Sequence, residues 1–301
     1  MDEFFNGRGF MIVAAITAAI AVLMSGTAGM GVTQDVWQGV FYTFDPSTVP
    51  NSFQKAVNLL CLGGIASLLI LLNKQYNFVR AVTWIFSSVF LLLSAVSVWI
   101  QPGLDVGLLM CMTLVATMFV IFAEYQQKGQ AQRSIFLAMT VASTFCLFNY
   151  RAVFLIPVIF LGFVQVKAMS AKGLVAAVLG LLTPPWIAVG LMLAHPVKSF
   201  NVPDVASIWS GADLAHLQLP IIIAALTALV TIIFTTINLM TVLNYRLQTR
   251  MYNAFIVITA VLTVLAMCFD FTHILSYLPI LNVCLAIQMA HRATIGKRQL
   301  L

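Results

Sequence analysis

Long apolar stretches follow one another through almost the whole chain, and this pattern most constrains the fold. Of the 301 residues, 61% are apolar and 8% are charged, whereas soluble domains carry about 25% charged residues. A transmembrane helix needs about 20 mostly apolar residues. The composition therefore excludes a soluble fold and predicts an all-α, polytopic integral membrane protein. We expect about ten transmembrane helices, at residues 9–28, 55–72, 81–100, 104–123, 134–149, 152–167, 173–194, 219–240, 253–270 and 274–290.

The basic residues alternate between the gaps that separate these stretches. Of the fifteen Lys and Arg residues, the ones in every second gap are Arg8, Lys74, Arg80, Lys128, Arg133, Lys167, Lys172, Arg246, Arg250, Arg292, Lys297 and Arg298. The other gaps hold only Lys55, Arg151 and Lys198. Cytoplasmic loops retain basic residues, so the alternation predicts that the N- and C-termini are both cytoplasmic. Residues 1–301 are interpreted as a single transmembrane domain.

Charge and cysteine content narrow the range of partners. The net charge of +6 comes from basic residues beside the apolar stretches, which favours membrane lipids as partners and gives no reason to expect nucleic acid. The five cysteines all lie inside apolar stretches and form no CxxC pair, so no disulfide framework, metal site or cofactor is expected. Residues 26–28 loosely imitate a signal-peptidase site, but Asp2 and Glu3 make a poor signal-peptide start, and we expect a retained first helix.

Two predicted outer loops, at 29–54 and 195–218, are much longer than the others. In the first, the apolar residues at 36, 37, 40, 41 and 44 recur at the spacing of one helix face. They predict a helix at 36–44 that lies in the membrane interface, with its aromatic rings at the headgroup level. The second loop repeats this pattern in brief, since Asp204 near a helix start is followed by Val205, Ile208 and Trp209.

Asp35 is the candidate catalytic residue. A carboxylate just past the first span could act as a general base that activates an acceptor hydroxyl against a lipid-linked donor. Alternatively, Asp35 caps the predicted interfacial helix. Trp37, on that helix, would contribute to substrate binding. Asp45-Pro46 is typical of a turn.

Arg151 is the basic residue that departs most from the alternation, because it lies between two short apolar stretches. A guanidinium group can bind two oxygens of a phosphate or pyrophosphate at once. The alternative is that Arg151 extends its charged end to the membrane surface or pairs with a nearby carboxylate.

Two Asp/His pairs, Asp213 with His216 and Asp270 with His273, have the i, i+3 spacing that places both members on one helix face. Such pairs could relay a proton or bind a divalent metal, although no third ligand can be identified. Simple pairing at the surface is the alternative. Asp270 follows a long apolar stretch, and an ionisable residue at the end of a membrane span is a candidate for function.

Pro184 and Pro185 stand together in the middle of the seventh stretch. Two prolines remove two backbone donors, which predicts a broken or kinked helix beside a cavity or hinge. We therefore include both among the candidate substrate-binding residues. Thr227, Thr231, Thr235 and Asn238 form a polar stripe on the eighth stretch that could border a substrate path or bond neighbouring helices together.

The segment SIFLAMTVASTFCLFNYRAVFLIPVIFLGFVQVKAMSAKGLVAAVLGLLTPPWIAVGLML, at 134–193, resembles the central helices of GT-C-type polytopic glycosyltransferases. The shared features are a short hairpin, Pro157, the basic gap with Lys167 and Lys172, and a helix with Gly180 and Pro184. A closer resemblance is to an uncharacterised family of bacterial inner-membrane proteins of about 300 residues, and the likeness covers about residues 55–194. The GT-C resemblance implies an acidic catalytic residue in the first outer loop, the position of Asp35.

Three functions are compatible with the sequence. The first is a GT-C-like factor of cell-envelope glycan or lipid assembly in the bacterial inner membrane. It would use a polyprenyl-phosphate-linked sugar, with Asp35 as base, Arg151 as phosphate ligand and the 36–44 helix as lid. The second is a small-molecule or lipid transporter or flippase, with Pro184, Pro185 and the threonine stripe along its path. The third is a non-catalytic scaffold for another membrane protein.

Overall fold

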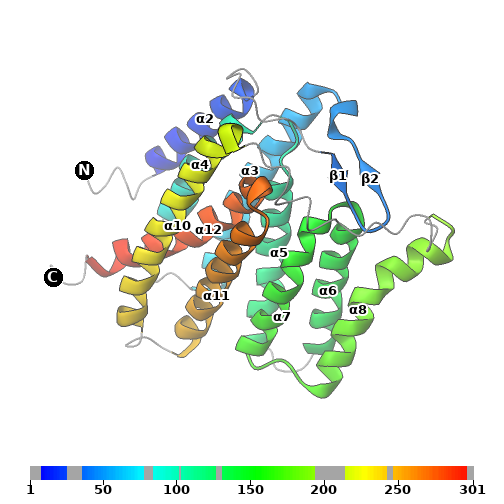
Figure 1. Ribbon diagram of the computed structural model, residues 1–301. Coiled ribbons are helices and arrows are strands. Elements are labelled where there is room, and N and C mark those ends of the chain that lie inside the picture. The colour runs from blue at the N-terminus through cyan, green and yellow to red at the C-terminus, as the bar shows by residue number, and fades with distance from the viewer. Residues whose placement is uncertain are drawn as a thin grey trace. The chain divides into compact units, whose positions relative to one another are not determined.

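A computed structural model describes residues 8–25, 36–77, 84–101, 103–126, 131–193, 214–242 and 247–296. In these ranges the chain is almost entirely helical (Figure 1), which confirms the all-α prediction. A helix coincides with each predicted span, and seven of the described helices are long and apolar enough to cross a membrane. Shorter apolar helices are found at Arg8–Met24, Ile85–Ile100 and Tyr150–Gln165. The number of crossings and the side on which the termini lie stay predictions.

The chain divides into two compact units. Unit 1 comprises 1–34, 50–115 and 211–301, and unit 2 comprises 35–49 and 116–210. Unit 1 contains α2 (Arg8–Met24), α3 (Asn51–Tyr76), α4 (Ile85–Ile100), α10 (Leu214–Val242), α11 (Leu247–Phe269), η3 (Phe271–His273) and α12 (Ile274–Gly296). Unit 2 contains β1 (Trp37–Gln38), β2 (Thr43–Phe44), η1 (Pro46–Thr48), α6 (Ala131–Phe148), η2 (Tyr150–Phe154), α7 (Leu155–Gln165) and α8 (Ala171–Gly190). Helix α5 (Val106–Gln126) begins in unit 1 and ends in unit 2.

Helix α12 is the buried helix of unit 1. From Ile274 to Ala290 every side chain except Met289 is buried, and the helix packs against α4, α10 and α11 (Figure 1). Helix α10, in contrast, exposes one apolar face, with Leu226, Leu229 and Ile233 on it. A helix with an exposed apolar face suits contact with lipid, whereas α12 is enclosed by protein.

In unit 2, α8 packs against α6 through a face of small residues. Gly173, Ala177, Gly180, Pro184 and Ala188 recur at helical spacing, and all are buried. A Cβ atom at Gly180 would lie 2.6 Å from the backbone oxygen of Phe136, so this glycine permits the close approach of the two helices. Small residues serve the same purpose between other membrane helices.

Of the predicted break or kink at Pro184 and Pro185, the break is not found. Helix α8 is assigned without interruption from Ala171 to Gly190. Pro185 lacks the N–H group that would reach the carbonyl of Leu181, and the hydroxyl of Ser143 donates to that carbonyl instead, at 2.7 Å. A neighbouring side chain thus satisfies a backbone group that proline leaves open.

The prediction of a helix at 36–44 is also wrong, because this segment forms a two-stranded antiparallel hairpin. Trp37 pairs with Phe44 and Gln38 with Thr43. At the tip, the N–H groups of Val40 and Tyr42 donate to the carbonyls of Cys146 and Leu147 at 3.1 and 3.2 Å. These carbonyls end α6 and have no partner within the helix. The hairpin therefore caps α6, a long-range contact that the local spacing of apolar residues did not reveal.

The turn predicted at Asp45-Pro46 is confirmed. Asp45 caps η1, and its carboxylate accepts from the N–H of Ser47 at 2.9 Å. Hydrogen bonds from Ser47 lower the pKa of this exposed carboxyl. In the second long outer loop, residues 194–213 lie outside the described residues, including His195, Asp204, Trp209 and Asp213.

Candidate functional site

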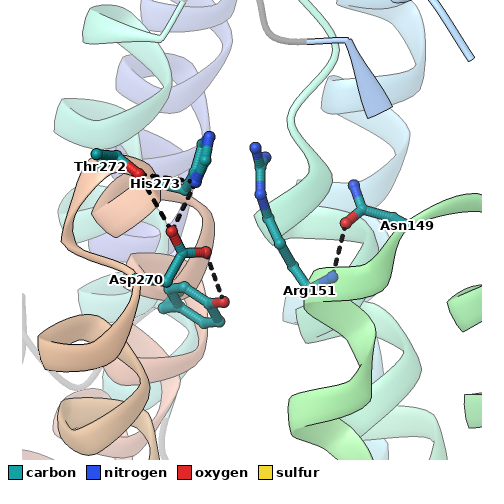
Figure 2. A network of polar contacts seen from close by, with 6 residues as sticks. Asn149, Arg151, Asp270, Thr272 and His273 are labelled. Carbon is teal, nitrogen blue, oxygen red and sulfur yellow. Dashed lines mark hydrogen bonds and ion pairs between the residues drawn. The ribbon is translucent and has the colours of Figure 1, made fainter. Parts of the chain in front are cut away.

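A cluster of polar side chains, two of them buried and two half-buried, lies where α11 ends and α12 begins, in unit 1. We call it the Asp270 cluster; it consists of Asp270, Thr272 and His273 (Figure 2), together with Tyr277. The Nδ1 atom of His273 lies 2.6 Å from Oδ1 of Asp270, and the hydroxyl of Thr272 donates to the same oxygen at 3.2 Å. The hydroxyl of Tyr277 donates to Oδ2 of Asp270 at 3.0 Å. Both carboxylate oxygens are therefore hydrogen-bonded, an arrangement that favours the charged carboxylate.

The i, i+3 spacing correctly predicted that the Asp270 and His273 side chains lie together. The local structure differs from the expected α-helix, because η3 is a short 3-10 helix that follows Asp270. The sequence interpretation missed Tyr277, which lies seven residues after Asp270 and is buried. A seven-residue spacing also returns to the same side of a helix, so this signal was present in the sequence.

A second buried carboxyl, Asp105, lies at the start of α5 in unit 1. The N–H of Gly107 donates to its Oδ1 atom at 2.7 Å, as at a helix N-cap. The backbone N–H of Asp105 donates to Oδ1 of Asn58, and Nδ2 of Asn58 donates to the carbonyl of Gly103 at 2.7 Å. Gly103 has φ of 84°, a conformation that glycine adopts without strain. We call Asn58, Gly103, Asp105 and Gly107 the Asp105 cluster.

The Asp105 cluster has one open hydrogen-bonding position. The Oδ2 atom of Asp105 is buried and has no hydrogen-bond partner among the described residues. Burial raises the pKa of the Asp105 carboxyl to about 7, although hydrogen bonds from the backbone of Gly107 and Leu108 oppose this effect. A carboxyl with this pKa gains and loses a proton near neutral pH.

Both clusters border the first turns of α12. A Cβ atom at Gly107 would lie 2.5 Å from the backbone oxygen of Ser276 and 3.0 Å from Oδ1 of Asp105. Ser276 precedes Tyr277, which bonds to Asp270. One turn further along α5, the Sγ atom of Cys111 lies 3.5 Å from the carbonyl oxygen of Pro279. Residues from α3, α5, η3 and α12 thus place two buried carboxyl groups beside one end of α12.

Arg151 belongs to unit 2, in the turn between α6 and α7. Asn149 caps η2 by accepting the backbone N–H of Arg151 at 3.0 Å (Figure 2). The Arg151 side chain is buried, and its guanidinium carbon lies 5.8 Å from the centre of the Tyr150 ring. Arg151 therefore does not reach freely into solvent, as a side chain extending to the membrane surface would.

The remaining predicted site residues are not brought together by the described structure. Trp37 is buried in the hairpin, with its ring centre 5.3 Å from that of Phe44. Pro184 belongs to the face of α8 that packs on α6. Asp35 lies outside the described residues, so its relation to Arg151 stays a prediction. No group of three or more His, Cys, Asp and Glu side chains in the described ranges could hold a metal ion.

The polar stripe on α10 does bond to a neighbouring helix. Nδ2 of Asn238 donates to Oε1 and to the backbone oxygen of Gln288 on α12, both at 2.7 Å. Thr227 and Thr231 donate to carbonyls of their own helix. The stripe faces the interior of unit 1, since Thr231 and Asn238 are buried.

Comparison with known proteins finds no match for this chain. No protein-family model, no curated protein and no solved structure matches it.

Proposed function

We propose that this multi-pass membrane protein is a proton-coupled transporter of a small molecule or lipid. The observation that carries the proposal is the pair of buried carboxyl groups, Asp105 and Asp270, beside one end of the enclosed helix α12. Ionisable residues buried within membrane proteins commonly mark ion and proton pathways. The bacterial inner membrane, which maintains a proton gradient, is the proposed location.

The two carboxyl groups have opposite surroundings. Asp270 has a hydrogen-bond donor at each oxygen, so its charged form is well accommodated. Asp105 has one oxygen without a donor, so its protonated form is favoured. Sites whose surroundings favour opposite protonation states are suited to proton exchange. In the proposed cycle, a proton that arrives at Asp270 weakens its bond to His273, and release of that proton restores the bond.

The test is gradient-driven transport in proteoliposomes. The wild-type protein is reconstituted, a pH gradient is imposed, and the uptake of a panel of radiolabelled amino acids, sugars and organic cations is measured. We expect uptake of at least one solute to depend on the gradient, and Asp270→Asn to lower it at least about tenfold. Asp45→Asn, which alters an exposed carboxyl outside both clusters, is the control. The proposal would be contradicted if uptake did not depend on the pH gradient, or if Asp270→Asn left the rate of uptake unchanged.

A second candidate function is GT-C-like transfer from a polyprenyl-phosphate-linked sugar, in which Arg151 binds the phosphate. Its support is the buried position of the Arg151 guanidinium beside Tyr150, since a buried guanidinium binds phosphate strongly. Asp35 would remain the base. The test is retention of a radiolabelled polyprenyl-phosphate sugar by purified protein. Arg151→Lys, which keeps the charge but loses two-point binding, should weaken retention, and equal retention would argue against this function.

A further inference from the structure

A buried polar face runs along α12 away from the Asp270 cluster. Tyr277, Cys284, Gln288 and His291 are separated by seven, four and three residues, which places them on the same side of the helix. All four side chains are buried. The face begins with the tyrosine that bonds to Asp270 and continues to His291, near the opposite end of the span Phe271–Arg292.

Helices α10 and α11 add polar groups to this face. Asn238 on α10 donates to Oε1 of Gln288, and Nε2 of Gln288 donates to Oδ1 of Asn253 on α11 at 3.1 Å. Thr227, Thr231 and Thr235 share the side of α10 that carries Asn238. Three helices thus contact one another through side-chain amides and hydroxyls. Packing alone would require only apolar side chains at these positions.

The hydrogen bonds of this face are incomplete. The Oγ1 atom of Thr235 and the Oδ1 atom of Asn238 are buried and have no hydrogen-bond partner among the described residues. Asn238 is fully buried. A buried polar atom without a partner is unfavourable, and ordered water is the usual way to satisfy it. Both atoms lie on the side of α10 that faces Gln288, so water bound there would adjoin the polar face of α12.

We propose that the face shared by α10, α11 and α12 is a hydrated proton path that connects the Asp270 cluster with His291. The inference rests on the proposed function and names its coupling ion and its route. The amides of Asn238, Asn253 and Gln288 orient the water molecules and exchange no protons themselves. Each water or hydroxyl accepts a proton on one lone pair and releases another, so its own bonding is unchanged. At the ends, Asp270 and His291 bind and release the proton.

Few other titratable groups surround this path. The described side chains of α4 and α10 include none. Arg250 and Cys268 on α11 are exposed. Within unit 1, Asp105 just before α5, Cys111 on α5 and Tyr252 on α11 are buried titratable groups on the segments around α12. Glu124, which is also buried, lies near the other end of α5, in unit 2. Asp105 adjoins the end where the path begins, which provides a second group that can exchange protons there.

The first test measures hydration at Cys284, which lies in the middle of the path. In a protein that keeps Cys284 as its single cysteine, transfer to D2O converts S–H to S–D, and infrared spectroscopy follows the change. The matched control moves the thiol to Val283, a buried neighbour at similar depth that is turned by about 100°, by combining Val283→Cys with Cys284→Ala. We expect exchange at Cys284 to be at least about tenfold faster, as for an amide or thiol in contact with water. Equal rates would overturn the proposal.

The second test measures proton leak into vesicles that contain a pH-sensitive dye, with no solute added. Thr231→Val removes a buried hydroxyl on the path, whereas Thr236→Val removes an exposed hydroxyl of the same helix. Each threonine hydroxyl donates to a carbonyl of its own helix. The two substitutions therefore remove the same kind of hydrogen bond and should affect the stability of α10 to a similar degree. We expect Thr231→Val and Gln288→Leu to slow proton entry about tenfold and Thr236→Val to leave it unchanged. Equal rates in all three variants would overturn the path.

The two proposals can fail separately. If gradient-driven uptake is present but Thr231→Val and Gln288→Leu do not slow proton entry, the transporter proposal stands and the path is wrong. If proton entry depends on these residues but no solute is taken up in response to the gradient, the path stands and the transporter proposal is wrong.

Discussion

The hydroxyl of Ser143 on α6 donates a 2.7 Å hydrogen bond to the carbonyl of Leu181 on α8. In a regular α-helix this carbonyl would accept the N–H of residue 185, which is proline in this chain. The bond therefore joins two helices at the point where one of them lacks its own donor. It allows α8 to remain helical through two consecutive prolines within an apolar surrounding.

Ser143→Ala should destabilise the α6–α8 pair. The Leu181 carbonyl would lose its donor, and hydrogen bonds between membrane helices contribute roughly 0.6 to 2 kcal/mol. The measurement is the midpoint of denaturation of the reconstituted protein. Pro185→Ala restores an N–H group for Leu181, so Ser143→Ala should cost less when Pro185→Ala is also present. Equal costs in both backgrounds would show that the proline is not the reason for the bond.

Gly180→Ala should also separate α6 and α8. The added Cβ would lie 2.6 Å from the Phe136 carbonyl oxygen and 3.0 Å from the Met139 Cβ. Overpacking of this kind costs about 1 to 3 kcal/mol, which exceeds the roughly 1 kcal/mol that alanine gains over glycine in a helix. Gly190→Ala in the same helix is the control, because nothing lies within 4 Å of its Cβ position. The same stability measurement should show a loss for the first variant and none for the second.

The positions of the helices could be predicted from the sequence because they depend on local properties. Runs of apolar residues gave the position of each helix, and the spacing of Asp270 and His273 gave their proximity. The small-residue face of α8 is also visible as spacing, from Gly173 to Ala188. These features need only the geometry of one helix.

Features that depend on contacts between distant segments could not be predicted. The 36–44 segment has helix-like spacing, but its backbone N–H groups bond to the end of α6, more than 100 residues later. The sequence did not single out Asp105, because its partner Asn58 lies 47 residues away in sequence. The Pro184-Pro185 pair predicted a break or a kink, and the absence of a break could not be foreseen because the compensating donor, Ser143, belongs to another helix.

Gly39→Ala should release the hairpin from α6. A Cβ atom at this position would lie 2.0 Å from the carbonyl oxygen of Leu147, and that carbonyl accepts the N–H of Tyr42. The backbone of the tip must shift, and the bonds from Val40 and Tyr42 should be lost. Hydrogen–deuterium exchange of the peptide that contains Val40 and Tyr42 should become faster, by about tenfold for each 1.4 kcal/mol of lost protection.

The control for the hairpin is Gly63→Ala, since nothing lies within 4 Å of a Cβ atom at Gly63. This variant should leave the exchange of the hairpin peptide unchanged. If Gly39→Ala leaves the hairpin as protected as the wild type does, the cap on α6 does not depend on the close approach of this glycine.

Asp105→Asn should change how the stability of the protein depends on pH. Burial raises the pKa of Asp105 to about 7 from a usual value of 3.8, so the folded protein holds a proton that the unfolded chain releases. The stability of the wild type should therefore fall as the pH rises between these two values, by up to about 1.4 kcal/mol per pH unit, and level off above pH 7. Asparagine has a similar shape and cannot ionise. The variant should therefore lose this slope, and its stability should exceed that of the wild type most clearly at pH 8.

Midpoints of thermal unfolding between pH 4 and pH 8 measure the effect, with Asp45→Asn as the control for an exposed carboxyl. Parallel curves for the wild type and Asp105→Asn would mean that Asp105 does not take up a proton on folding, and would remove one of the two groups on which proton coupling depends.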